Sequence, residues 1–270
     1  GSLIPEGAQV WLARSSEDVK PDGFCRLVPD REARAVKRAC LDMLFVREAG
    51  QRTELARALI DAALAAANAD GLKGIWGYLA DFPGQDILEA TGGKKLREIR
   101  LLRHDRLNTF SSPRPPGGYR LRPVSLPADL KSVADIYNET FAEMWNFRSH
   151  GPDDIAEWFE SRDTSPEDCL ILEQDGEGVG LAVLAVDPER QAHSDPAAYI
   201  PDIGVVSTHR RKGLGGVLLA AAAERARKIG ITAIELIVDE EDDGARAFYG
   251  KLGFAEMGKI NVYEWGESRG

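Results

Sequence analysis

The sequence predicts an α/β fold in which a mixed central sheet flanked by helices occurs twice, with the first copy degenerate and shortened. An apolar strand ends at 204–216 in a basic, glycine-rich turn that opens an alanine-rich helix, and a fainter version of this order lies around 51–79. A segment rich in Pro and Gly separates the two. The chain has 270 residues, of which 43% are hydrophobic, enough for two domain cores.

The separating segment, 113–118, has the sequence Pro-Arg-Pro-Pro-Gly-Gly. Closely spaced Pro and Gly break both helices and strands, and such segments are typical of linkers. We therefore expect a degenerate domain over 1–112 and a complete domain over 119–270, joined by this linker.

The first domain repeats the second in outline. A helix over 53–68 that ends at Gly71 corresponds to a helix over 214–229 that ends at Gly230. Alignment on these glycines places Gln51, Glu54 and Ala56 where the second copy has Arg210, Gly213 and Gly215. Because a carboxylate at Glu54 would repel an anion, only the second copy is expected to bind one.

The elements of the second domain follow from apolar periodicity and turn residues. The expected order is a strand 119–123, a helix 127–145, a helix from Pro152, a hairpin of 169–173 and 179–186, a fourth strand 199–206, the helix 214–229, a strand 231–238 and a helix carrying Tyr249. Two segments of the first copy, 74–79 and 86–91, correspond to the last two elements.

The turn at 204–216 has the composition of a phosphate site. Free N–H groups and the positive dipole end of a helix start bind anions, and glycines allow a close approach. Walker and dinucleotide-binding loops have other spacings, whereas this chain has Arg210-x-x-Gly213-x-Gly215. The pattern resembles the pyrophosphate-binding signature of the GCN5-related N-acetyltransferase (GNAT) superfamily, whose ligand is coenzyme A.

A second motif lies downstream at the separation usual in that family. The hallmark Asn-x-x-Ala-x-x-x-Tyr-x-x-x-Gly-Phe is matched by Ala245, Tyr249, Gly253 and Phe254, while Asp242 replaces the usual Asn. The resemblance covers about 119–265 and implies a tandem GNAT fold, similar to that of mycothiol synthase, whose amino-terminal half is degenerate.

The resemblance implies acetyl-CoA as acyl donor and assigns the residues that hold it. Backbone groups of the fourth strand would bind the pantetheine arm, and successive amides of the turn would hold the diphosphate. The expected binding residues are Val205, Val206, Arg210, Arg211, Lys212, Gly213, Leu214, Gly215, Gly216 and Asp242.

Transfer to an amine needs a base, because a free amine is mostly protonated at neutral pH, and a proton donor for the departing thiolate. The family resemblance implies Tyr249 as general acid. Asp202, on the fourth strand, is our candidate base, and the alternatives are Glu143, Glu240 and Glu241.

The acceptor is expected to be a small-molecule primary amine, attacked directly in a ternary complex. Trp145, Phe147 and His150, between the first two helices of the second domain, are candidates to line its pocket, and core packing is the alternative for the aromatic residues. From a different class, the alternative function is a non-catalytic coenzyme A-binding sensor or interaction module. Gly1 and Ser2, with no initiating Met, resemble a cloning remnant, which leaves room for a larger polypeptide.

Composition excludes other classes. A net charge of −10 opposes general nucleic-acid binding by long-range repulsion. Without an apolar run of about 20 residues or a signal segment, we expect no membrane association and a cytoplasmic location. The three Cys are far apart and no His, Asp or Glu spacing suggests a metal, so neither disulfides nor a metal site is expected.

Overall fold

The computed structural model describes residues 7–14, 20–28, 30–47, 52–80, 85–145, 147–161, 164–187 and 196–266. The first half of the chain forms β1 (Gln9–Ala13), β2 (Gly23–Val28), α1 (Arg31–Ala35), β3 (Arg38–Val46), α2 (Arg52–Ala69), β4 (Gly74–Ala80), α3 (Gln85–Ala90) and β5 (Lys94–His104). The second half forms β6 (Tyr119–Pro123), α4 (Leu130–Phe141), α5 (Pro152–Ser161), β7 (Cys169–Gln174), β8 (Glu177–Val183), β9 (Ala197–Tyr199), β10 (Ile203–Val205), α7 (Leu214–Lys228), β11 (Ala233–Asp239), α8 (Asp243–Lys251) and β12 (Ala255–Gly266).

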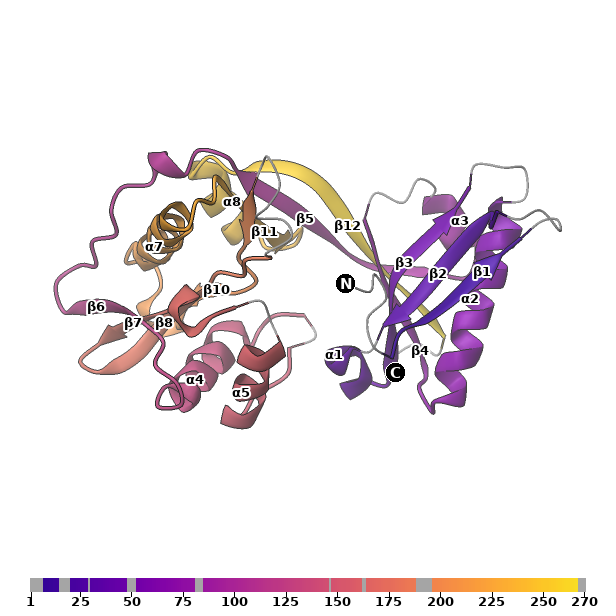
Figure 1. Cartoon of the computed structure of the whole chain (residues 1–270), viewed down its shortest axis with the longest axis horizontal. Coiled ribbons are helices and arrows are strands. Elements are labelled where there is room, and N and C mark those ends of the chain that lie inside the picture. The colour runs from indigo at the N-terminus through magenta and orange to yellow at the C-terminus, as the bar shows by residue number, and fades with distance from the viewer. Residues whose placement is uncertain are drawn as a thin grey trace. The chain divides into compact units, whose positions relative to one another are not determined.

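The element order confirms an α/β fold with a repeated, shortened first half (Figure 1). The strand, helix, strand and helix β3, α2, β4 and α3 repeat β9, α7, β11 and α8, and in both copies the two strands are parallel. The residues described ahead of β3 contain a hairpin and the five-residue α1, whereas the second copy has in addition β6 and two longer helices, α4 and α5.

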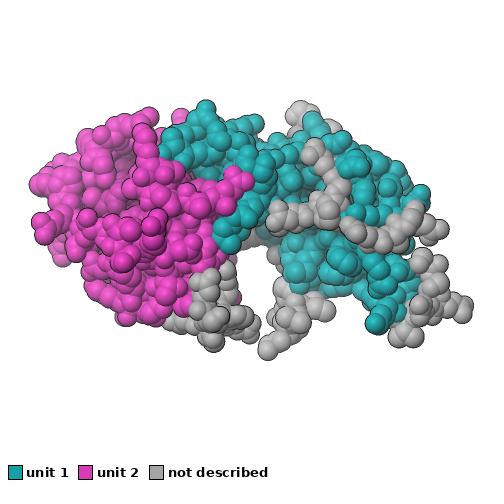
Figure 2. Space-filling model, turned by 90° about the horizontal axis from the view of Figure 1, so that it is seen from above, with its two compact units in different colours: residues 1–101, 238–247, 257–270 teal, residues 102–237, 248–256 magenta. Residues whose placement is uncertain are grey.

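The chain divides into two compact units that differ from the predicted domains (Figure 2). The first comprises 1–101, 238–247 and 257–270, and the second 102–237 and 248–256. The expected linker, 113–118, is irregular but lies inside the second unit, and the carboxy-terminal strand joins the first. The physical reason is strand pairing, because β12 pairs antiparallel with β4 from Ile260 to Gly266.

In the first unit the sheet order is β1-β2-β3-β4-β12-β5, with β11 next to β5. A buried cluster between this sheet and α2 includes Leu41, Ile60, Ile75 and Trp265. Gly77 is required beside Trp265, because a Cβ at that position would lie 2.9 Å from its ring. Arg38 and Glu264 form a buried ion pair of 2.7 Å that joins β3 to β12.

In the second unit a four-stranded sheet has the order β10-β8-β7-β6. A separate core cluster gathers residues of this sheet, α4, α5 and α7, among them Ile136, Ile155, Ile171 and Leu218. The expected strand 119–123 and the helix beginning at Pro152 are confirmed. The helix predicted over 127–145 is shorter, Leu130–Phe141, because Asp129 accepts hydrogen bonds from Arg122 and from the backbone of Ser125, which hold the preceding segment as a turn.

The fourth strand predicted over 199–206 is two strands in two sheets. Tyr199 pairs with Ala185, and Ile203 pairs with Ala182. Residues 200–202 therefore lie opposite residues 183–184, so this strand has one residue more than β8 and its extension. This is a β-bulge, and Pro201, which has no N–H to donate, lies in it. β9 then continues beside β11, whereas β10 pairs with β8 and forms the edge of the other sheet.

Candidate active site

The open edge of β10 is the first part of the site. Val183 donates to the Asp202 carbonyl, and Val206 donates to the Val179 carbonyl, so residues 202, 204 and 206 face β8. Alternation in an antiparallel ladder therefore turns the backbone groups of Ile203 and Val205 to the other edge. The N–H of Val206 is used inside the sheet. Of the two backbones predicted to bind pantetheine, only that of Val205 faces outward, together with Ile203, which the sequence prediction omitted.

The glycine-rich turn that follows β10 has the geometry of an anion cradle. Gly213 is the N-cap of α7 with φ of 78°, and Arg211 is also left-handed, with φ of 64°. A left-handed residue followed by helical ones brings successive N–H groups to one side, and the helix dipole adds positive potential there. Within the described residues, α7 has no side-chain cap and no acidic residue in its first turn. The cradle is therefore open to an anion.

The side chains of this turn divide into buried and exposed ones. Leu214 is 1% exposed and belongs to the core, so only its backbone can contribute to the cradle. Arg210 is turned toward protein carbonyls, with Nε 3.1 Å from the Val205 oxygen and Nη2 3.0 Å from the Thr140 oxygen. Arg210 thus fixes the end of β10 although it is exposed, as are Arg211 and Lys212 beside the cradle.

The helix that carries Tyr249 lies next to the cradle. A Cβ on Gly215 would lie 3.4 Å from the Phe248 ring, so the first turn of α7 contacts α8 directly. Tyr249 is 8% exposed, and its ring contacts those of Phe248 and Phe254. Asp242, expected near the coenzyme, caps α8 instead, since its Oδ1 accepts from the Ala245 N–H at 2.8 Å.

The candidate bases have different surroundings. Arg100 donates to Glu240 and holds the pKa of that carboxyl below its ordinary value, and Glu241 pairs with Arg97 at 2.9 Å. A lowered pKa makes the Glu240 carboxylate a weaker proton acceptor. Asp202 is half-buried and directly follows the bulge. Alternation along the strand places its side chain on the face of Gly204, which packs against α4.

Aromatic residues gather around Tyr137 of α4, which the sequence prediction did not select. Its ring contacts those of Phe147 and His150, at centroid distances of 6.3 and 4.9 Å, and that of Trp158 at 5.2 Å. Asn138 holds the loop in place, because its side chain bonds both the N–H and the carbonyl of His150. A signal for Tyr137 existed in the sequence, because at helical spacing it falls on one face with Leu130, Val133 and Phe141.

Trp145, the third predicted acceptor residue, lies half-buried in the turn that follows α4. Beside the cradle, the Nε2 atom of His209 lies at hydrogen-bond distance, 2.8 Å, from the side-chain oxygen of Gln174, and Lys212 donates to the Tyr119 hydroxyl at 3.3 Å.

Among the described residues, no three His, Cys, Asp or Glu are grouped as metal ligands, and no helix is long and apolar enough to cross a membrane.

A profile of the "Acetyltransferase (GNAT) family" matches residues 130–254. The chain is 25% identical over 227 residues to a mycothiol acetyltransferase of Thermomonospora curvata, covering 81% of this chain and 70% of the relative. It is 27% identical over 145 residues to the L-amino acid N-acyltransferase MnaT of Escherichia coli, covering 50% of this chain and 81% of that protein.

Among solved structures, a tandem GNAT protein from the clavulanic acid biosynthesis pathway is similar in fold, with a TM-score of 0.72 and 16% identity. The match covers 99% of this chain and 86% of that one. Residues 130–254 thus carry an acetyltransferase domain of the GNAT family, and the chain as a whole has the tandem GNAT fold.

Proposed function

We propose that this protein transfers an acetyl group from acetyl-CoA to a primary amine of a small molecule, by direct attack in a ternary complex. The observation that carries the proposal is the junction of three parts in the second copy. The open edge of β10 leads into the uncapped start of α7, and the first turn of α7 contacts the helix that bears Tyr249. Such a junction serves a ligand with an extended arm and a diphosphate.

The residues of the second copy fit acetyl-CoA as acyl donor. The backbone of Ile203 and Val205 would hold the pantetheine arm, and amides of Arg211 to Gly216 would hold the diphosphate. Arg211 and Lys212 add positive charge where the diphosphate would lie. In the first copy, Glu54 stands in the first turn of α2, at the place of this cradle, and its carboxylate opposes an anion.

The chemistry requires three proton transfers. A base removes a proton from the ammonium of the acceptor, and Asp202 is proposed for this role, directly or through water. The neutral nitrogen attacks the thioester carbonyl, a C–N bond forms, the nitrogen gives its second proton to water, and the C–S bond breaks as the tetrahedral intermediate collapses. The hydroxyl of Tyr249 donates a proton to the departing thiolate, a task that suits a phenol in reach and pKa.

The acceptor is proposed to enter beside the aromatic residues between α4 and α5. Phe147 and His150 are held there by Tyr137 and Asn138, and a cationic amine is attracted to aromatic faces. Mycothiol acetyltransferases and an L-amino acid N-acyltransferase are among the relatives, which directs an acceptor search toward amino acids and aminosugar conjugates.

Titration calorimetry of acetyl-CoA into the whole chain tests the proposal. We expect one site, with a dissociation constant on the order of micromolar. A panel of amines, scanned by detection of the released thiol, then identifies the acceptor. Two binding sites would contradict a degenerate first copy, and the absence of binding would contradict the cradle.

A further inference from the structure

The strand β5 belongs by sequence to the degenerate half, yet its side chains reach the helix that bears Tyr249. Helix α8 has only nine residues. Helices shorter than about 12 residues are marginal in water without tertiary support. The direction of the Tyr249 side chain therefore depends on what holds the two ends of α8, and β5 contacts both.

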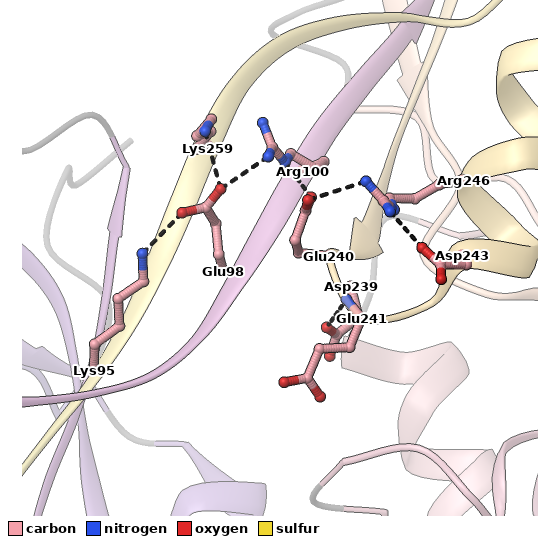
Figure 3. Close-up of polar contacts among 9 residues, drawn as sticks. All are labelled: Lys95, Glu98, Arg100, Asp239, Glu240, Glu241, Asp243, Arg246 and Lys259. Carbon is pink, nitrogen blue, oxygen red and sulfur yellow. Dashed lines mark hydrogen bonds and ion pairs between the residues drawn. The ribbon is translucent and has the colours of Figure 1, made fainter.

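The first tie is an ion-pair chain at the start of α8 (Figure 3). Arg100 of β5 donates to Glu240, whose other oxygen accepts from Arg246 of α8 at 3.0 Å. Arg246 also pairs with Asp243 at 2.5 Å, within the first turn of the helix. The backbone adds to this tie, because the N–H of Glu240 donates to the carbonyl of Glu98 at 2.9 Å.

The second tie is a buried histidine at the end of α8. His104, the last residue of β5, is 4% exposed. Its Nδ1 accepts from the backbone N–H of Arg106 at 3.1 Å, so Nε2 carries the proton and donates to the Leu252 carbonyl, also at 3.1 Å. The turn fits closely here, because a Cβ on Gly253, whose φ is 90°, would lie 3.3 Å from Nε2.

The histidine also contacts the ring that contacts Tyr249. The His104 and Phe254 ring centroids lie 5.2 Å apart, and those of Phe254 and Tyr249 lie 5.4 Å apart. The backbone closes the same corner, since the Tyr249 carbonyl accepts from the N–H groups of Leu252 and Phe254, each at 3.1 Å.

We infer that β5 is a positioning strand for Tyr249, with Arg100 and His104 as its positioning residues at the two ends of α8. This inference rests on the proposed role of Tyr249 as general acid. It gives the degenerate copy a function in catalysis, although that copy has lost its own anion cradle. Both act through α8, because their contacts lie at its two ends.

The first experiment measures α8 directly, without any substrate. Hydrogen exchange by mass spectrometry compares the whole wild-type chain with Arg100→Ala and His104→Ala. We expect faster exchange in peptides that cover 243–254 and unchanged exchange in α7. The conservative variants Arg100→Lys and His104→Gln, which keep a donor, should restore much of the protection. Lys131→Ala is the control, since Lys131 forms a surface ion pair with Asp135 within α4. Unchanged exchange at 243–254 in both alanine variants would overturn the inference.

The second experiment separates positioning from general stability. With the acceptor found by the amine panel, we expect His104→Ala to lower kcat roughly ten- to a hundredfold, while the KM for acetyl-CoA changes less than about twofold. The same substitution in a Tyr249→Phe background should cost nothing further, because residues that act as one unit are not additive. An equal loss in both backgrounds would show a merely structural role and overturn the inference. Should His104→Ala fail to fold, Arg100→Ala is compared in the wild-type and Tyr249→Phe backgrounds in the same way.

The two proposals can fail separately. An unchanged rate in Tyr249→Phe would remove the general-acid role, whatever the exchange of α8. A reduced rate in Tyr249→Phe together with an unaffected α8 in the β5 variants would remove only the positioning strand.

Discussion

The ring of Tyr249 lies edge-on to the ring of Phe254, with centroids 5.4 Å apart and planes at 65°. Tyr249 is 8% exposed, so the ring is held in one orientation by its neighbours. Edge-to-face contact of this kind is made by the ring, so a phenylalanine at this position would keep it.

Replacing Tyr249 by Phe therefore tests the hydroxyl alone. We expect kcat to fall about 10²- to 10⁴-fold, the contribution usual for a proton donor, while calorimetry shows unchanged affinity for acetyl-CoA. Tyr263→Phe is a matched control, because that hydroxyl is buried in the first unit and has no hydrogen-bond partner among the described residues. Its rate should equal the wild type, and an unaltered rate in Tyr249→Phe would exclude the general acid.

Substitution of Gly213 should abolish coenzyme binding. Its φ of 78° costs an L-residue roughly 1–2 kcal/mol, and Gly213→Glu, which copies Glu54 of the first copy, also places a carboxylate at the cradle. Calorimetry with acetyl-CoA should detect no binding to this variant. Gly117→Ala is the control, since a Cβ there meets nothing within 4 Å and lies outside the cradle. Retained affinity in Gly213→Glu would show that the diphosphate binds elsewhere.

The buried pair of Arg38 and Glu264 should be important for the stability of the first unit. The two side chains are 2% and 7% exposed, and Glu264 also accepts from the Trp76 indole at 3.3 Å. Glu264→Ala leaves a buried guanidinium without its partner and should lower the free energy of unfolding by about 3–5 kcal/mol. Asp135→Ala, in a surface pair with Lys131, should cost less than about 1 kcal/mol. Urea unfolding of both variants checks this, and equal losses would contradict it.

Burial of His104 predicts a loss of stability in acid. Burial lowers the pKa of its imidazole, with Arg106 acting in the same direction and Asp105 in the opposite one. The unfolded chain, with an ordinary pKa of about 6.5, then binds a proton before the folded chain does. This stabilisation is complete above about pH 6.5 and is lost as pH falls through the folded pKa.

Urea midpoints at pH 7.5 and 5.5 measure that loss. His104→Gln cannot titrate and should lose less stability between these two values than the wild type. If the two urea midpoints of His104→Gln differ by as much as those of the wild type, groups other than His104 cause the acid sensitivity.

Most of the site was predictable because its signals are local. The left-handed Gly213, the strand-to-helix turn and the helix of Tyr249 follow from short spacings, since backbone conformation at a turn depends on its own residues. Arg210 was predictable as a member of the motif, but its direction was not. Its guanidinium meets the carbonyl of Thr140, seventy residues earlier in the chain.

The missed features are those that depend on partners distant in the chain. The bulge at Pro201 appears only when the register of β8 against the fourth strand is known, and it decides that Ile203, and not Val206, faces outward. The ion pairs that hold Glu240 and Glu241 come from β5, about 140 residues away in the chain.

The sequence by itself determined the α/β class and the repeat, and it indicated the turn at 204–216 and the helix of Tyr249 as the candidate site, because each depends on periodicity or on a motif within one turn or helix. Only the tertiary structure decided where the chain divides, because β12 pairs with β4 of the first half and β5 lies beside β11 of the second. Strand pairing joins residues without regard to their separation in sequence, so a composition break at 113–118 could mark a linker but could not assign the strands on either side of it.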